Sequence, residues 1–489
     1  MNIFTDQDYS GTRPSSSTPS VRLALASLSL SMLMPSLDTS IANAGLPTLA
    51  SGFGASFQSV QWIVLAYLLA ITTLIVSVGR LGDSLGRRKL LLAGIGLFTA
   101  ASLLCGLAPT LTLLIASRAL QGLGAAIMLA LTVAMVGETV PKSKTGRAMG
   151  MLGTMSAIGT TLGPSLGGLL IASLGWRSIF LINVPLGVLN FFMAHRWLPA
   201  DILLKRPGQH VGFDKVGTLL LSASLAAYAL AMTIGRGQIG RLNILLLLVA
   251  VLGAGLFVFA ETKAASPLIC LAMFRDPVLS AGLTMSSLVS TVMMATLVVG
   301  PFYLSRGLGL ETALVGIALS GGPLFAALAG VPAGRLVDRF GSGRMTIGGL
   351  AGITTGAAVL SIMPASLGVL GYIAPIVVIT SSYALFQAAN NTAIMTGTDA
   401  NRRGVISGML SLSRNLGLIT GASVMGAVFA MASATTDITT AQPEAIAAGM
   451  RITFAVAAAI IVAAVAISIG SRALATRLPA PYPPLNSEI

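Results

Sequence analysis

The amino-acid sequence predicts an all-α membrane protein with 14 transmembrane helices arranged 6+2+6. Of the 489 residues, 55% are hydrophobic and only 9% are charged, and the mean hydropathy is +0.89. A soluble domain has about 25% charged residues, so this composition excludes a soluble enzyme. The apolar residues fall into long segments, and one loop sequence occurs twice. The net charge of +14 therefore bears on membrane orientation rather than on nucleic-acid binding.

Each apolar segment is long enough to cross a bilayer, which takes about 20 mostly apolar residues in a helix. The first twenty residues are polar, and we expect a disordered tail at 1–20 rather than a cleaved signal, because the apolar run that follows is too long. The fourteen segments lie near 21–46, 58–79, 90–108, 110–137, 148–173, 176–195, 215–234, 242–260, 278–304, 312–334, 345–363, 369–396, 405–432 and 449–471.

Positive charges predict the orientation of these spans. If the N-terminus is cytoplasmic, most of the 29 Lys and Arg residues fall in cytoplasmic loops, as the positive-inside rule requires. Two arginines, Arg118 and Arg414, lie inside spans. Because the number of spans is even, both termini are expected in the cytoplasm, including a tail at 475–489.

A loop motif that occurs twice, Gly-Arg-Leu-x-Asp-x-x-Gly, indicates an internal duplication. GRLGDSLGRRK follows the second span, from Gly79 to Lys89, and GRLVDRFGSGR follows the tenth, from Gly334 to Arg344. Eight spans separate the copies, where two joined six-helix units would give six, so two helices are inserted between the units. The predicted domains are a six-helix bundle at 21–196, a loop with two inserted helices at 197–262, and a second six-helix bundle at 263–474.

Four motifs resemble those of one transporter family. GRLGDSLGRRK is similar to the loop signature of the major facilitator superfamily, and the fourteen-span layout resembles its drug:proton antiporter family of the multidrug efflux type. LDTSIANAGLP, RALQGLGAA and GTTLGPSLGG resemble that family's motifs in the first, fourth and fifth spans, although Gly45 stands where Ala is usual. The resemblance covers nearly the whole chain from Val21 to Leu474. It implies the major facilitator fold and transport of small molecules.

The loop motif implies a cytoplasmic gate. In the family, the acidic residue pairs with basic groups to close the cytoplasmic side, and here these residues are Asp83 and Arg87. The alternative is that the charges only fix topology. The gate residues carried over are Gly79, Asp83, Gly86, Arg87, Arg88 and, from the second copy, Asp338.

The fifth-span motif predicts close helix packing. Gly159, Gly163 and Gly167 recur every four positions and so line one helix face, which lets another helix approach closely. Pro164 favours a kink, and Gly168 completes the motif. The resemblance adds that antiporters carry this pattern more than symporters do, which favours export.

A single carboxylate, Asp38, lies well inside a span, and Arg118 lies at the same depth, ~12 Å below the outer surface at 1.5 Å per residue. An ionised Asp there costs roughly 2.5–3.5 kcal/mol, so it is expected to face a cavity or a partner. In the family the first and fourth helices both line the central cavity. We expect Asp38 and Arg118 to form a separable pair or to share a water network, with proton coupling through Asp38. The alternative is a permanent structural ion pair.

Other polar residues within spans are candidates for lining a cavity. The role of Arg414 stays open between a cavity cation, a contact to anionic groups and a gate element. The further candidates are Gln387, Asn390, Asn391 and Gln121.

Together these features predict a proton-coupled antiporter that exports hydrophobic or amphipathic small molecules, such as drugs, biocides and lipophilic cations, across a bacterial cytoplasmic membrane. The expected partners are a substrate, protons and lipid, without nucleic acid, and the chain is expected to be monomeric. We expect no cofactor and no metal site, because the proton gradient would drive transport and the two cysteines and two histidines form no ligand cluster. The alternatives are a dedicated exporter of a self-made metabolite, such as a siderophore or an antibiotic, and a non-transporting membrane sensor.

Overall fold

The computed structural model describes residues 18–140, 145–201, 214–233, 240–264, 274–396, 403–433 and 441–475. All regular elements in these ranges are helical, and 14 helical segments are long and apolar enough to cross a membrane. The prediction of an all-α protein with 14 spans is therefore confirmed, whereas the side of the membrane on which the termini lie stays a prediction. The predicted tails lie outside the described residues, except that 18–20 and 475 belong to terminal helices.

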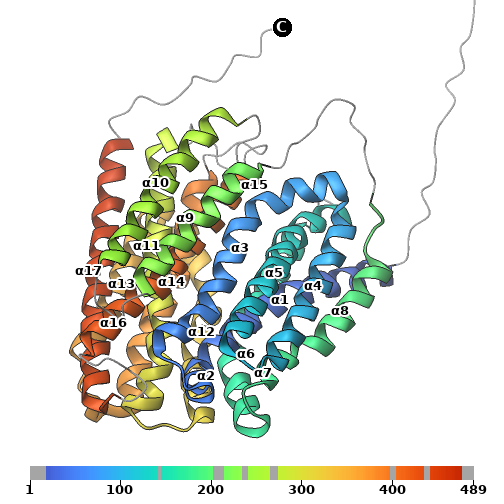
Figure 1. The fold of residues 1–489 in the computed structure, drawn as a ribbon. Coiled ribbons are helices and arrows are strands. Elements are labelled where there is room, and N and C mark those ends of the chain that lie inside the picture. The colour runs from blue at the N-terminus through green and yellow to red at the C-terminus, as the bar shows by residue number, and fades with distance from the viewer. Residues whose placement is uncertain are drawn as a thin grey trace, which may run out of the picture.

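The first six spans form an N-terminal bundle (Figure 1). Helix α2 is a short addition after the first span, and α7 and α8 together make the sixth. The helices are α1 (Thr18–Ala44), α2 (Leu46–Phe53), α3 (Phe57–Leu85), α4 (Arg87–Leu107), α5 (Leu111–Thr139), α6 (Thr145–Leu174), α7 (Ser178–Leu181) and α8 (Asn183–Trp197).

The last six spans form a C-terminal bundle, and two inserted helices stand between the bundles in sequence. A short π-helical segment, η3, ends the span Pro277–Gly307, and another, η5, interrupts the span Gly408–Ala432. The inserted helices are α9 (Lys215–Thr233) and α10 (Arg241–Lys263). The C-terminal bundle comprises α11 (Pro277–Phe302), η3 (Tyr303–Gly307), α12 (Thr312–Phe340), α13 (Ser342–Ile362), η4 (Ala365–Leu367), α14 (Gly368–Thr396), α15 (Arg403–Thr420), η5 (Gly421–Met425), α16 (Gly426–Ala432) and α17 (Pro443–Ala475).

The duplicated loop has the same backbone feature in both copies. Gly86 lies between α3 and α4 with φ +97°, and Gly341 lies between α12 and α13 with φ +84°. These values fall in a region that favours glycine. The last glycine shared by the two loop sequences therefore makes an equivalent tight turn in each bundle.

The inserted helices pack as a pair against the seam between the bundles. Helix α9 contacts α10, α3 of the N-terminal bundle and η5 of the C-terminal bundle. Trp62 of α3 donates a hydrogen bond to the Thr233 hydroxyl at the end of α9, at 3.0 Å. Helix α10 packs mainly on α9 and exposes large apolar side chains such as Leu252 and Phe259. In a spanning helix, such a face is suited to lipid.

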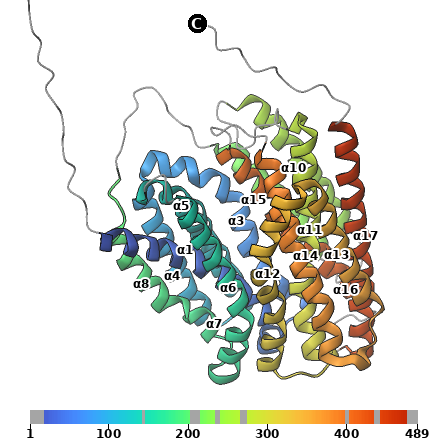
Figure 2. The same ribbon diagram turned by 180° about the vertical axis from the view of Figure 1, so that it is seen from behind.

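The two bundles meet most closely at the end that holds α2 (Figures 1 and 2). The ring of Phe57 packs edge-on against Phe302, with 4.8 Å between centroids, and against Phe429, with 5.7 Å. Hydrogen bonds cross the seam at the same end: Gln61 Nε2 to the Ala422 carbonyl (3.0 Å), Arg306 Nη2 to Ser51 Oγ (2.9 Å), and Ser165 N to Ser320 Oγ (2.9 Å). We call these contacts the α2-end seam.

Candidate functional site

Asp38 lies in α1, three residues after Pro35, and only 1% of it is exposed. Three side chains donate hydrogen bonds to its carboxylate. Arg118 Nη1 lies 2.5 Å from Oδ2, and Gln121 Nε2 and Asn183 Nδ2 lie 2.9 and 2.8 Å from Oδ1. Burying an ionised carboxylate is tolerated when it is paired and hydrogen-bonded in this way. The structure therefore brings Asp38 and Arg118 together as a direct ion pair.

Besides its bond to Asp38, Arg118 makes several further contacts and is 0% exposed. Its Nε donates to the carbonyl oxygen of Ile63 at 3.1 Å, and its Nη1 also reaches Gln121 Oε1 at 2.6 Å. The guanidinium carbon lies 4.2 Å from the centroid of the Tyr67 ring, a cation–π contact that stabilises a desolvated cation. Helix α3, which carries Ile63 and Tyr67, thus covers the Asp38–Arg118 pair.

The pair and Gln121 lie inside the N-terminal bundle rather than on a cavity surface. Gln121 is 0% exposed, and its Nε2 also donates to Ser102 Oγ on α4 at 2.8 Å. Of the two surroundings expected for Asp38, a cavity or a partner, the structure shows the partner Arg118, whereas Gln121 is enclosed and does not line a cavity as expected. The reason is that α3 and α8 enclose the carboxylate that α1 presents.

A second polar layer joins α1 and α8 without touching Asp38. Asn190 accepts a hydrogen bond from Ser27 Oγ (2.9 Å) and donates one to Ser31 Oγ (2.8 Å). Asn190 follows Asn183 by two helical turns and lies on the same face of α8. The α1–α8 contact therefore has one layer that holds the carboxylate and one that only packs the helices.

Protonation of Asp38 would change this network. A neutral carboxyl group turns one oxygen from acceptor to donor and removes the charge that pairs with Arg118. Leaving one partner of a buried ion pair uncompensated costs about 3–5 kcal/mol. A proton on Asp38 would therefore weaken its contacts with Arg118 of α5 and Asn183 of α8.

The predicted gate region ties the start of α4 to two neighbouring elements. Arg87 Nη1 donates to Glu138 Oε1, at the end of α5, at 2.7 Å, and both side chains are partly exposed. An exposed ion pair of this kind contributes up to about 1 kcal/mol. The backbone N–H of Arg88 donates to Asp201 Oδ1 at 2.7 Å, and its guanidinium donates to the His195 carbonyl.

The remaining gate candidates differ in how the structure places them. A Cβ at Gly86 would lie 2.6 Å from the Asp201 carboxylate, so only glycine fits this turn. Gly79 and Asp83 lie in α3, and their surroundings fall outside what the structure describes. Asp338 is exposed on α12 and forms no ion pair with any described residue.

The glycines of the fifth-span motif face two different helices. Cβ atoms built at Gly159, Gly163 and Gly167 would lie within 2.4 to 3.1 Å of α1 atoms. A Cβ at Gly168 would instead lie 2.8 Å from the carbonyl oxygen of Thr312 in α12, and the Pro164 carbonyl faces α12 as well. Helix α6 therefore packs closely on α1 with one face and on the C-terminal bundle with another.

The C-terminal bundle contains a cavity of about 150 Å³, which we call the Arg414 cavity. It includes three of the predicted lining residues. Asn390, in contrast, is 3% exposed and donates to the Gly282 carbonyl at 3.1 Å, so it packs α14 on α11 instead. The cavity is lined by Ser286 of α11, by Gln387, Asn391 and Met395 of α14, and by Leu410, Ser411 and Arg414 of α15.

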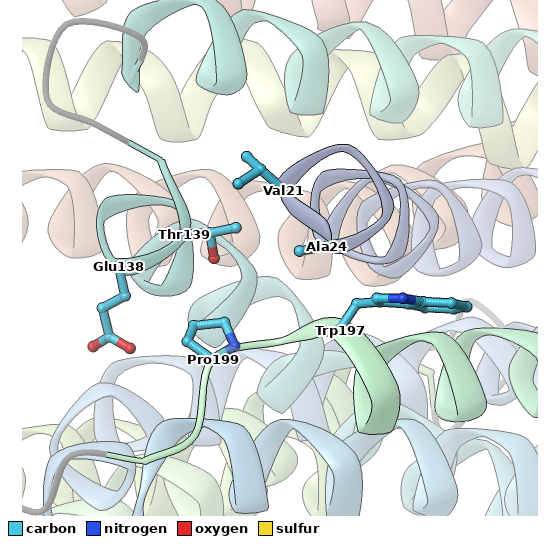
Figure 3. Close-up of a pocket in the computed structure, with 6 residues that line it drawn as sticks. All are labelled: Val21, Ala24, Glu138, Thr139, Trp197 and Pro199. Atoms are coloured by element: carbon cyan, nitrogen blue, oxygen red, sulfur yellow. The ribbon is translucent and has the colours of Figure 1, made fainter. Parts of the chain in front are cut away.

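Another cavity, of about 200 Å³, lies beside the gate region in the N-terminal bundle. Figure 3 shows the residues around it, with the Trp197 ring next to Ala24 of α1. Glu138 is the charged residue among those that line it. The lining residues are Val21, Ala24, Glu138, Thr139, Trp197 and Pro199.

The sequence model described as Major Facilitator Superfamily matches residues 28–422. The chain belongs to the major facilitator superfamily. It is therefore a membrane transporter of small molecules and not an enzyme. Among the described residues, no group of three or more His, Cys, Asp or Glu could hold a metal ion.

Several relatives have names that mention drug efflux or transport. Multidrug resistance protein Stp of Mycobacterium tuberculosis is 32% identical over 422 residues, which cover 83% of this chain and 76% of that protein. Drug efflux pump JefA of the same species is 30% identical over 425 residues, which cover 84% of this chain and 81% of that protein. Riboflavin transporter RibZ of Clostridioides difficile is 28% identical over 408 residues, which cover 83% of this chain and 88% of that protein.

Solved structures of the superfamily share the fold. An inward-facing, unoccupied bacterial homologue of the human lysosomal transporter Spinster has a TM-score of 0.68 at 15% identity, covering 96% of this chain and 100% of that one. The xylose transporter XylE of Escherichia coli, partially occluded and inward open, has a TM-score of 0.64 at 12% identity, covering 94% and 98%.

Sequence reasoning missed Asn183, Ser102 and Tyr67 as parts of the Asp38 network. A usable indication existed for Asn183, because it lies ~10 Å from the start of the span predicted near 176–195, close to the depth of Asp38. Ser102 and Tyr67 are common residue types in spans, and only the packing of α3 and α4 brings them to the network.

Proposed function

We propose that this transporter exports hydrophobic or amphipathic small molecules from the cytoplasm in exchange for protons. The observation that carries the proposal is the Asp38 carboxylate, buried in a span and bound by Arg118, Gln121 and Asn183. An ionisable residue inside a membrane span marks ion pathways and proton relays in transporters. The names of Stp and JefA add support for drug efflux.

The proposed coupling step is the protonation of Asp38. With Asp38 ionised, the ion pair to Arg118 holds α1 against α5. With Asp38 protonated, the pair separates and the N-terminal bundle repacks, which biases the transporter toward its other orientation. Export then follows when the proton binds from the outside and leaves to the cytoplasm.

The large-scale motion assigned to this step is alternating access between the bundles at 21–196 and 263–474. In this proposal both termini face the cytoplasm, the protein lies in a bacterial cytoplasmic membrane and acts as a monomer, and the α2-end seam is the outer closure. The contacts of Arg87 with Glu138 and of Arg88 with Asp201 belong to the cytoplasmic gate. The packing of α6 on α1 through Gly159 and Gly163 supports an antiporter, as the motif implies.

A second candidate is a dedicated exporter of one metabolite. The relative named riboflavin transporter favours it, because its name specifies one solute at 28% identity over 83% of this chain. A broad panel of compounds separates the two functions, since a dedicated carrier responds to few of them.

The decisive experiment compares the wild type with Asp38→Asn in inside-out vesicles that have an acidic interior. Asparagine keeps the size and hydrogen-bonding ability of the side chain but cannot bind and release a proton. We expect some lipophilic compounds to drain the proton gradient with the wild type, and the drainage to fall at least ~10-fold with Asp38→Asn, because a titratable group is essential to coupling. Fluorescence of a pH-sensitive dye reports the gradient.

The matched control is Glu311→Gln, which removes an exposed carboxylate at the start of α12 without a side-chain cap. This variant is expected to behave as the wild type at equal abundance. Equal drainage by Asp38→Asn and the wild type would make Asp38 a structural residue. No drainage by any compound with either protein would favour the dedicated exporter or a non-transporting sensor.

A further inference from the structure

The two intramembrane arginines have opposite surroundings. Arg118 is 0% exposed and paired with Asp38. Arg414 lies inside the candidate span Gly408–Ala432, is exposed, and forms no ion pair with any residue that the structure describes. A charged side chain within a span costs roughly 2.5–3.5 kcal/mol on insertion scales and normally has a partner or faces a functional cavity. Arg414 therefore belongs to the second case, because it lines the Arg414 cavity.

We propose that the Arg414 cavity is a subsite for the anionic head group of an amphipathic cargo, with Arg414 as the cation that binds it. The inference rests on the proposed export function and names the chemical class of substrate that the site selects. Carboxylate, phosphate and sulfonate groups share the required chemistry.

The residues around Arg414 suit such a head group. A guanidinium group presents a planar fork of donors that binds a carboxylate or phosphate through two hydrogen bonds. Asn391, Ser286 and Ser411 add amide and hydroxyl donors to the same cavity. None of the residues that line the cavity is acidic, so no lining carboxylate repels the anion.

The size of the cavity fits a head group rather than a whole drug. Its volume is about 150 Å³, whereas pockets for drug-sized ligands enclose about 300–1,000 Å³. Met395 and Leu410 line the same cavity, and methionine offers a flexible apolar surface that adapts to different shapes. The anion is therefore held by Arg414, while the apolar body of the cargo extends past these two side chains.

The position of the cavity also suits transport. Its walls come from α11, α14 and α15. Helix α15 contacts α3, and α11 contacts α1, so two of the three walls belong to helices that meet the N-terminal bundle. A cargo held there is bound by helices that would move relative to the N-terminal bundle in alternating access.

The test measures binding of three probes that share one naphthyl-alkyl body and end in a carboxylate, a carboxamide or a trimethylammonium group. Full-length protein in phosphatidylcholine nanodiscs is titrated with each radiolabelled probe. We expect the wild type to bind the carboxylate ~10-fold or more tightly than the carboxamide, in line with a charged hydrogen bond, and the ammonium more weakly still. Arg414→Gln is expected to bind the carboxylate and the carboxamide equally.

Two further variants keep the result interpretable. Arg414→Lys retains the charge without the fork and should keep part of the preference, which covers the case in which Arg414→Gln fails to fold. Arg339→Gln removes an exposed arginine of α12 that lies over Phe340 and should keep the full preference. An unchanged preference in Arg414→Gln, or no preference in the wild type, would overturn the subsite.

An anionic lipid could supply the same chemistry, so the titration is repeated with phosphatidylglycerol in the nanodiscs. A preference that persists supports a cargo site, whereas a preference that the lipid abolishes assigns Arg414 to a lipid phosphate and overturns the proposal. Equilibrium binding needs no proton gradient. If the protein prefers the carboxylate probe through Arg414 but no compound drains the proton gradient, the subsite stands and the export function is contradicted. If compounds drain the gradient in a way that depends on Asp38 but the carboxylate is not preferred, export stands and the subsite is contradicted.

Discussion

At the scale of single residues, most of the hydrogen bonds to the Asp38 carboxylate come from neutral side chains rather than from a charged one. Arg118 supplies one donor to the carboxylate, and the neutral side chains of Gln121 and Asn183 supply two more. A carboxylate held by three donors is fixed in position. Asn183 is a positioning residue in this arrangement, since it acts through Asp38.

Asn183→Ala is expected to reduce proton-coupled export about tenfold. The substitution removes one hydrogen bond to a charged group, which is worth about 1.5–3 kcal/mol. Asn190→Ala is the matched control, because among the described residues the Asn190 side chain bonds Ser27 and Ser31 and not Asp38. Initial rates of gradient drainage, measured at several values of pH and at equal abundance, compare the two variants. Equal losses in both would indicate that Asn183 acts by packing α1 and α8 alone, whereas the positioning role also requires an altered pH profile in Asn183→Ala.

At the scale of helices, α6 shows how one glycine motif can serve two contacts. Gly159, Gly163 and Gly167 face α1, while Gly168 faces α12. Helices in a membrane gain stability from close packing at small residues, since lipid is as apolar as their side chains. The α1 face fixes the helix that carries Asp38, and the α12 face joins the two bundles.

Gly163→Ala is expected to destabilise the protein by about 1–3 kcal/mol, as overpacking does. The added Cβ would lie 2.4 Å from the Ser40 Cβ in α1, which forces the two helices apart. Gly153→Ala, on the same helix, meets nothing within 4 Å and should not destabilise the protein. Thermal unfolding of both purified proteins in the same detergent gives the comparison. A Gly163→Ala protein as stable as Gly153→Ala would show that α1 and α6 accommodate the added methyl group without loss of stability.

At the scale of the whole molecule, the two bundles are joined at the α2-end seam by aromatic packing of Phe57 and by hydrogen bonds such as Ser165 to Ser320. The inserted helix α9 touches both bundles beside this seam. Alternating access requires the seam to separate when the transporter changes orientation. Close packing of α6 on α12 accompanies these contacts, so it too has to separate when the orientation changes.

A disulfide between cysteines introduced at Ser165 and Ser320 is expected to block transport. The backbone N–H of Ser165 lies 2.9 Å from Ser320 Oγ, so the two Cα atoms lie within the range that a disulfide spans. Oxidation should reduce export at least ~10-fold and a reductant should restore it, while each single cysteine variant keeps its activity under both conditions. Full activity in completely cross-linked protein would mean that this part of the seam stays closed throughout the cycle.

The class of the molecule and much of its chemistry could be predicted from the amino-acid sequence. Apolar segments of about 20 residues must become helices in a bilayer because every backbone polar group has to be satisfied internally, so the 14 spans could be predicted from composition alone. The isolated charges at Asp38, Arg118 and Arg414 were visible for the same reason, since a charge within a span is rare. The duplicated glycine turn at Gly86 and Gly341 was visible as a repeated motif.

Which side chains meet depends on how the helices pack in three dimensions. Depth along a helix places Asp38 and Arg118 at one level, but the rotation of each helix decides that Asn183 and Gln121 complete the network while Asn390 turns toward α11. The sequence likewise could not distinguish the enclosed Arg118 from the exposed Arg414. In a membrane nearly every face of a helix is apolar, so the sequence pattern of a span carries little information about which face meets a neighbour, and packing between helices has to supply it.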